Sequence, residues 1–80
     1  MARVTVLYFA SLRDAAGMAG ETVDTDAADL RALYDELRSR HGFVLPPDRL
    51  RVAVAGAFAR WDDALVEGSE IAFIPPVSGG

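Results

Sequence analysis

The chain has 80 residues, with no cysteine, no lysine and one histidine, which excludes disulfides, thiolate ligands, iron–sulfur clusters, Schiff-base lysines and multi-histidine metal sites. Eight arginines against twelve acidic residues give a net charge of −4, without the basic run that nucleic acid or an anionic membrane surface requires. No stretch approaches the ~18 apolar residues of a membrane span and no signal-peptide pattern is present, so we expect one cytoplasmic domain.

The first 25 residues predict two strands joined by a loop. Arg3–Phe9 is rich in β-branched and aromatic residues, and both of its alternating sets are largely apolar, as in a central strand. Residues 10–18 predict a loop or a single helical turn, with Gly17 and Gly20 as its markers. Glu21–Thr25 is short, alternating and polar, which is typical of an edge strand.

The clearest element is a helix in the middle of the chain. Its apolar residues recur at i, i+3, i+4 and i+7 and predict one buried stripe: Leu30, Leu33, Tyr34 and Leu37. We expect Asp26 as the N-cap, Asp29 in the first turn and Gly42 as the C-cap. Glu36 and Arg40 form an i,i+4 pair on the opposite face.

A hairpin is predicted after the helix. Pro46-Pro47 ends regular structure. Arg51–Ala55 and Phe58–Trp61 then read as two strands around a two-residue turn, Gly56-Ala57.

A polar connection and a last strand complete the pattern. Asp62–Glu70 predicts a connection anchored by buried Leu65 and Val66, with a turn at Gly68-Ser69. Ile71–Ile74 is an apolar run that predicts another central strand.

This order of elements predicts an α+β fold. Two strands, one main helix and three strands fit a single mixed sheet with the helix packed on one face. Parallel pairing of the first and last strands at the centre would give the β-grasp, or ubiquitin-like, arrangement. We expect this domain to span residues 1–74, followed by an extended tail of residues 75–80.

The side chains offer no convincing catalytic or metal-binding constellation. His41 is alone and lies at the expected end of the helix, where a cation favours the dipole. Asp62-Asp63 has no histidine or third acid near it in sequence, so a solvated turn is the better interpretation. We expect no metal site.

The last six residues carry the strongest functional signal. Pro75-Pro76 favours an extended backbone, and Gly79-Gly80 has no side chains, so it could enter a narrow channel and present a main-chain carboxylate. Average glycine usage would end a protein in two glycines only about once in 200 cases. From spacing alone, a frayed terminus remains the open alternative.

Two segments resemble the small subunit of molybdopterin synthase. They are Leu7–Arg13 near the start and Ile71–Gly80 at the end, and the likeness in length and element order extends over the whole chain. Two positions depart from the family pattern. Ala55 stands where the family often has Asn, and Ser69 stands where its turn would have Asp.

The resemblance implies a non-catalytic sulfur carrier without a bound cofactor. A ubiquitin-activating-like adenylyltransferase would adenylate the Gly80 carboxylate with ATP, and a sulfur-delivering enzyme would provide the sulfur of a thiocarboxylate. The tail would then enter the large synthase subunit, where the active site is expected. There it would donate sulfur to cyclic pyranopterin monophosphate in molybdenum cofactor biosynthesis, within a heterotetramer.

The resemblance also implies site residues. Phe9, Phe58 and Ile74 would dock to the partners, Arg13 would offer a salt bridge at the rim, and Gly79 would give the tail passage. The residues implied to hold the tail extended inside the partner are Pro75, Pro76, Val77 and Ser78. Core burial of Phe9 and Phe58, or a merely solvated Arg13, remain alternatives.

Two other functions remain open. The chain could carry sulfur for another pathway, such as thiamine synthesis, or it could be a ubiquitin-like protein modifier or a plain binding module. Since the chain has no lysine, it could not form lysine-linked chains of itself, although it could modify other proteins.

Overall fold

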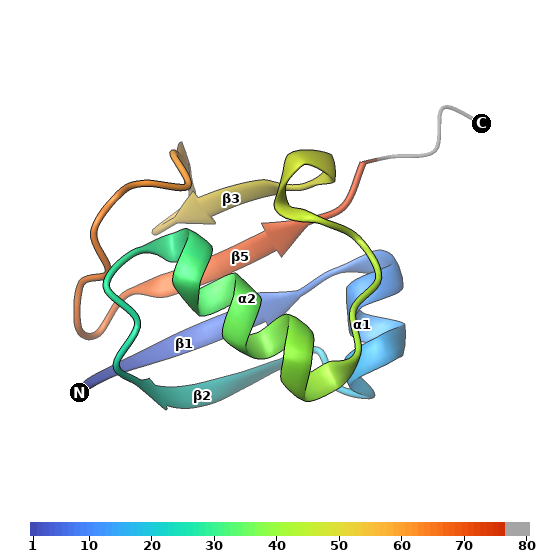
Figure 1. Ribbon diagram of the computed structural model, residues 1–80, viewed down its shortest axis with the longest axis horizontal. Helices are drawn as coiled ribbons and strands as arrows, with labels where there is room; N and C mark the ends of the chain where they lie inside the picture. Colours follow the sequence, from blue (N-terminus) through green and yellow to red (C-terminus); the bar gives the residue numbers. More distant parts are fainter. Residues whose placement is uncertain (77–80) are drawn as a thin grey trace.

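The computed structural model describes residues 1–76 and shows a five-stranded sheet with a helix packed across one face (Figure 1). The strands are β1 (Ala2–Tyr8), β2 (Gly20–Thr25), β3 (Arg51–Val54), β4 (Ala57–Ala59) and β5 (Glu70–Ile74). The helical segments are α1 (Ala10–Ala16), α2 (Leu30–His41) and the 3-10 turn η1 (Pro47–Arg49). None of the helices in this part of the chain is long and apolar enough to cross a membrane.

The sheet has the order β2-β1-β5-β3-β4, in which only the central β1–β5 pair is parallel. This confirms the predicted mixed sheet and β-grasp arrangement. In Figure 1, α2 runs diagonally across one face of the sheet, and α1 lies beyond the end of β1.

The core lies between α2 and the sheet. The predicted helical stripe is confirmed, since Leu30, Leu33, Tyr34 and Leu37 are all buried. The facing side chains of the central strands are also buried: Val4, Val6, Tyr8, Val52, Ile71 and Phe73. Aromatic rings fill the middle of this layer, where the ring centroids of Tyr34 and Phe73 are 5.1 Å apart.

The start of α2 differs from the prediction. The helix begins at Leu30, and the Asp29 side chain is the N-cap, accepting a hydrogen bond from the Ala32 backbone N–H at 2.8 Å. Asp26 instead lies 3.6 Å from the N-terminal ammonium group. Both aspartates could serve as an N-cap. The helix begins after Asp29, because Asp29 directly precedes Leu30, the first residue of the buried stripe. The predicted C-cap is confirmed, because Gly42 has φ 74°.

The segment after β1 also differs from the prediction. Residues 10–16 form a seven-residue helix, α1, rather than a loop or a single turn. Only Leu12 of this helix is buried, so the sequence carries no apolar stripe there. Phe9 is the N-cap residue of α1, so the predicted strand ends one residue early, at Tyr8.

The hairpin turn is shifted by one residue. The turn residues are Ala55 and Gly56, with φ 52° and 83°, because Val54 pairs with Ala57. A type I′ hairpin turn requires positive φ at both central residues. Trp61, which we expected in the second strand, lies outside β4.

The connection before β5 is only partly as predicted. Leu65 packs against the core, but Val66 is 62% exposed, so its predicted burial is wrong. The turn contains Gly68, with φ 82°, and the Ser69 hydroxyl donates to the Val66 carbonyl at 2.6 Å.

Candidate functional site

The sheet face that points away from α2 carries a row of apolar residues. Leu7, Ala72, Ala53 and Phe58 pair in register across β1, β5, β3 and β4. Residues paired in this way share one face of the sheet. Phe58, at the end of the row, is 67% exposed. The open face therefore presents apolar side chains to a potential partner.

The chain leaves the sheet at the segment Ile74–Pro76, which we call the tail root. Ile74 is the last residue of β5, Pro75 is buried and Pro76 is exposed. Two grooves share the tail root as a wall. The first has a volume of about 800 Å³ and is otherwise lined by Phe9, Ala10, Ser11 and Arg13. The second has a volume of about 500 Å³ and is otherwise lined by Asp48, Arg49, Leu50, Arg51 and Phe58.

The four residues expected to bind partners all lie around the tail root. Phe9, Arg13 and Ile74 line the first groove, and Phe58 joins Ile74 in the second. Phe9 is 43% exposed and Phe58 67%, so neither belongs to the buried core. The tail residues Val77, Ser78, Gly79 and Gly80 lie outside the described residues.

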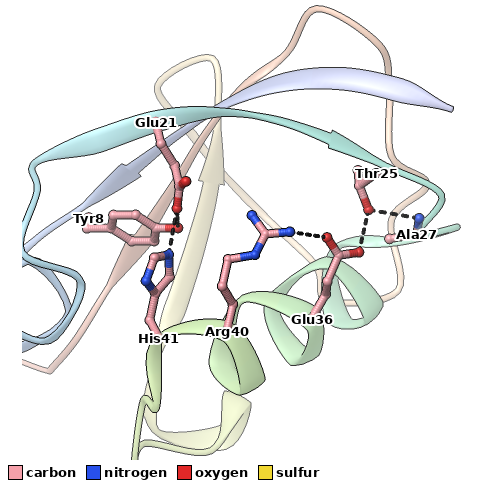
Figure 2. A network of polar contacts seen from close by, with 7 residues as sticks. All are labelled: Tyr8, Glu21, Thr25, Ala27, Glu36, Arg40 and His41. Atoms are coloured by element: carbon pink, nitrogen blue, oxygen red, sulfur yellow. Dashed lines mark hydrogen bonds and ion pairs between the residues drawn. The ribbon is translucent and has the colours of Figure 1, made fainter.

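A partly buried polar cluster fixes the end of β1, immediately before Phe9. As Figure 2 shows, the Tyr8 hydroxyl and the His41 ring converge on the Glu21 carboxylate. Tyr8 Oη donates to Glu21 Oε2 at 2.6 Å, and His41 Nε2 lies 2.6 Å from the same oxygen. This contact joins β1, β2 and the last residue of α2.

The pKa shifts in this cluster keep Glu21 ionised, so that its carboxylate can accept both hydrogen bonds. Burial, followed by the hydrogen bond to Glu21, raises the pKa of the Tyr8 hydroxyl, so Tyr8 keeps its proton and donates. Burial acts to raise the pKa of Glu21, but the hydrogen bonds from Tyr8 and His41 outweigh it and the pKa is lowered. Glu21 is therefore a carboxylate at neutral pH, and the strand that leads to Phe9 is held from two sides.

Sequence reasoning assigned no role to Arg49 or Arg51, which both line the second groove. The Arg51 guanidinium carbon lies 5.2 Å from the centroid of the Phe58 ring, a cation–π distance. The true register places Ala53 opposite Phe58, so Arg51, two residues before Ala53, lies diagonally across from the ring. The predicted turn placed Phe58 opposite Ala55 instead, which put the ring two residues farther from Arg51.

Apart from Ser11 and Asp48, the residues that line the two grooves are apolar or carry guanidinium groups. Among residues 1–76 no group of three or more His, Asp or Glu side chains is arranged to hold a metal ion. The side chains around the tail root instead offer apolar contact and guanidinium groups, which suit the docking of a protein partner.

The sequence matches a known protein family over nearly its whole length. Residues 6–80 match the model of the ThiS family. The chain is 32% identical to the molybdopterin synthase sulfur carrier subunit of Escherichia coli K12, over 96% of this chain and 99% of the relative. It is 34% identical to the human protein of the same name, over 100% and 97%.

Two solved structures have the same fold. A putative molybdopterin converting factor, subunit 1, from Pyrococcus furiosus superposes with a TM-score of 0.80 at 30% identity, covering 96% of this chain and 100% of that one. The small archaeal modifier protein 1 of H. volcanii superposes with a TM-score of 0.79 at 27% identity, with the same coverage. Relatives with this fold thus include proteins named as synthase subunits and a protein named as a modifier.

Proposed function

Because the chain belongs to the ThiS family, we infer that it is a sulfur carrier, and we propose that it is the sulfur-donor subunit of a molybdopterin synthase. The observation that carries the proposal is a match along nearly the whole length of four curated relatives, each named molybdopterin synthase sulfur carrier subunit. The match to the family model extends to residue 80 and so includes Gly79 and Gly80.

The proposed reacting group is the main-chain carboxylate of Gly80. A carboxylate is a poor electrophile, so its oxygen first attacks the α-phosphorus of ATP and forms an acyl-adenylate with release of pyrophosphate. Sulfide provided by a sulfur-delivering enzyme then attacks the acyl carbon and displaces AMP, which leaves a thiocarboxylate on Gly80. The adenylyltransferase supplies the ATP site, so the carrier needs no cofactor of its own.

The proposed acceptor is cyclic pyranopterin monophosphate bound by the large synthase subunit. The tail delivers the thiocarboxylate to the active site of that subunit. In this proposal Gly79, which has no side chain, lets the tail pass through a narrow channel, and the residues that hold the tail extended are Pro75, Pro76, Val77 and Ser78. Two sulfur atoms are needed for each dithiolene, which fits a heterotetramer with two carriers. The exposed residues around the tail root support docking, since Phe9 and Phe58 lie on either side of Ile74 and Arg13 lines the first groove.

Intact mass spectrometry tests the carrier chemistry. After co-expression with the adenylyltransferase and the sulfur-delivering enzyme, we expect the mass to increase by the replacement of one oxygen with sulfur. Deletion of Gly80 should abolish both this change and the thiolation of the pterin by the large subunit. The free energy of unfolding should be unchanged, because Gly80 follows the last core strand. Undiminished pterin thiolation by the deletion variant would refute the proposal.

A second candidate function is protein modification. The similarity to the small archaeal modifier protein, at a TM-score of 0.79, favours it. In this case, activated chains would become attached to other proteins. Mass spectrometry of the conjugates formed in whole cells would reveal these attachments. A carrier for another sulfur-containing metabolite would instead form the thiocarboxylate but fail to bind the large synthase subunit.

A further inference from the structure

Arginines gather around the tail root although the chain as a whole is acidic, with a net charge of −4. Half of the eight arginines have partners among residues 1–76, three in ion pairs and one with backbone carbonyls: Arg3, Arg40, Arg60 and Arg38. The others form no ion pair with the described residues: Arg13, Arg31, Arg49 and Arg51. Three of these four line the two grooves.

The second groove combines this charge with an apolar wall. Leu50, Phe58, Ile74 and Pro75 supply apolar surface, and the exposed Arg49 and Arg51 supply positive charge. Asp48 is the only carboxylate among the described residues that line either groove. An apolar centre with a charged rim is the usual organisation of a protein–protein interface.

Arg51 is positioned by its neighbours. It pairs with Ile74 across β3 and β5, which places it on the open face beside the tail root. Its guanidinium carbon lies 5.2 Å from the Phe58 ring centroid, and Phe58 is itself 67% exposed. A guanidinium group that rests on an aromatic ring keeps its planar N–H edge available for two parallel hydrogen bonds to a carboxylate.

We propose that the large synthase subunit straddles the tail root and presents carboxylates to Arg49 and Arg51, next to an apolar side chain that packs against Phe58. Charge complementarity argues for this occupant, because the groove is positive on an acidic chain. Continuity argues for a single partner, because Ile74, Pro75 and Pro76 wall both grooves. The proposal rests on the proposed function and adds Arg49 and Arg51 to its docking residues, on the side of the tail root opposite Phe9 and Arg13.

Association kinetics at several salt concentrations test the proposal. Binding of the purified large subunit to the full-length chain is compared for wild type, R51E and the double variant R49E/R51E. Charge pairs at the rim of an interface mainly accelerate association, so we expect the double variant to associate about tenfold more slowly at low salt. Its rate should also depend less on salt than that of wild type.

Two variants serve as controls. Arg31 is exposed on α2, has no ion pair among the described residues and lines neither groove, so R31E changes the net charge by the same amount as R51E at a distant place. We expect R31E to associate at close to the wild-type rate. R51K retains the charge but loses the planar bidentate group, so its association rate should be nearly normal and its dissociation faster.

The outcomes separate this inference from the function on which it rests. If the wild-type chain fails to bind the large subunit, the proposed function is wrong. If wild type binds and R49E/R51E associates equally fast at every salt concentration, the docking inference is overturned. Equal impairment by R31E and R51E would also overturn it, since net charge alone would then explain the effect. Normal binding with impaired adenylation would assign the arginines to the activating enzyme and contradict the proposal.

Discussion

Ala55 has a backbone conformation that is unfavourable for a residue with a side chain. Its φ of 52° lies in the left-handed region, where residues other than Gly, Asn or Asp are rare. The type I′ turn requires this conformation at both Ala55 and Gly56. The departure from the family pattern at Ala55 thus falls at the one hairpin position where an Asn would relieve strain.

We predict that Ala55→Asn raises the free energy of unfolding by about 0.5–1 kcal/mol, since Asn tolerates the left-handed region. Urea denaturation of the full chain measures the change. Ala57→Asn is the matched control, because Ala57 is also exposed but lies in β4, where Asn is disfavoured. A gain at position 57 as large as at position 55 would contradict the explanation by turn strain.

Glu21 makes stability dependent on pH. Burial acts to raise its pKa, but the hydrogen bonds from Tyr8 and His41 prevail, so the pKa is lower in the folded than in the unfolded chain. A carboxylate with a depressed folded pKa stabilises the fold above its unfolded pKa, and this contribution is lost as the pH falls through the folded pKa.

We therefore predict that Glu21→Gln lowers the free energy of unfolding at pH 7, and that this deficit is smaller at an acidic pH below the ordinary pKa of glutamate, about 4.3, where the wild-type contribution is being lost. Urea denaturation at both pH values measures this difference. Glu67→Gln, at an exposed turn, serves as the control and should shift stability by a similar small amount at each pH. A deficit in Glu21→Gln that is the same at both pH values would contradict the role of the ionised group.

At the scale of elements, α2 depends on its N-cap. Asp29 accepts the hydrogen bond that closes the first turn, whereas Asp26 is exposed and forms an ion pair with the N-terminal ammonium group. We predict that Asp29→Ala lowers the free energy of unfolding by about 1 kcal/mol and that Asp26→Ala lowers it by less than about 0.5 kcal/mol. Thermal and urea unfolding measure both. Equal losses would mean that the two aspartates contribute by charge and not by capping.

The elements show why some of the fold follows from sequence and some does not. The stripe from Leu30 to Leu37 repeats over two turns, so α2 could be located from periodicity alone. Helix α1 buries only Leu12 and therefore leaves no periodic signal. The predicted hairpin register was wrong for another reason. Turns with positive φ at both central residues are usually identified by an Asn-Gly pair, and this turn has Ala55 in place of Asn.

At the scale of the whole molecule, the candidate site depends on how the strands are paired. Tyr8 pairs with Phe73 in the parallel β1–β5 ladder, so Phe9 and Ile74, which follow them, meet at the same edge of the sheet. The element order predicted that ladder, and so this part of the site could be anticipated. The groove that contains Arg49 and Arg51 could not be anticipated, because the contact between Arg51 and Phe58 depends on the hairpin register.

The two faces of the sheet should respond differently to the loss of an aromatic ring. Phe58 is largely exposed and Phe73 is fully buried. We predict that Phe58→Ala weakens binding of the large subunit by about tenfold and changes the unfolding free energy by less than about 1 kcal/mol, the latter mainly through the lost cation–π contact with Arg51. Calorimetric titration and urea denaturation measure the two effects. Phe73→Ala should instead destabilise the fold by about 3–5 kcal/mol. Normal affinity in Phe58→Ala would exclude Phe58 from the docking face.

The parallel pairing of β1 and β5 also determines how the protein bears mechanical load. A pull on the chain beyond Ile74, resisted by the rest of the body, acts along β5 and tends to slide it past β1 and β3. In this shearing geometry the hydrogen bonds between the strands are loaded together, whereas peeling would break them one after another. Force applied at the tail root is thus spread over both sides of the central strand. If the tail is repeatedly drawn out of a channel in its partner, as the proposed function implies, the domain can then withstand each extraction without unfolding.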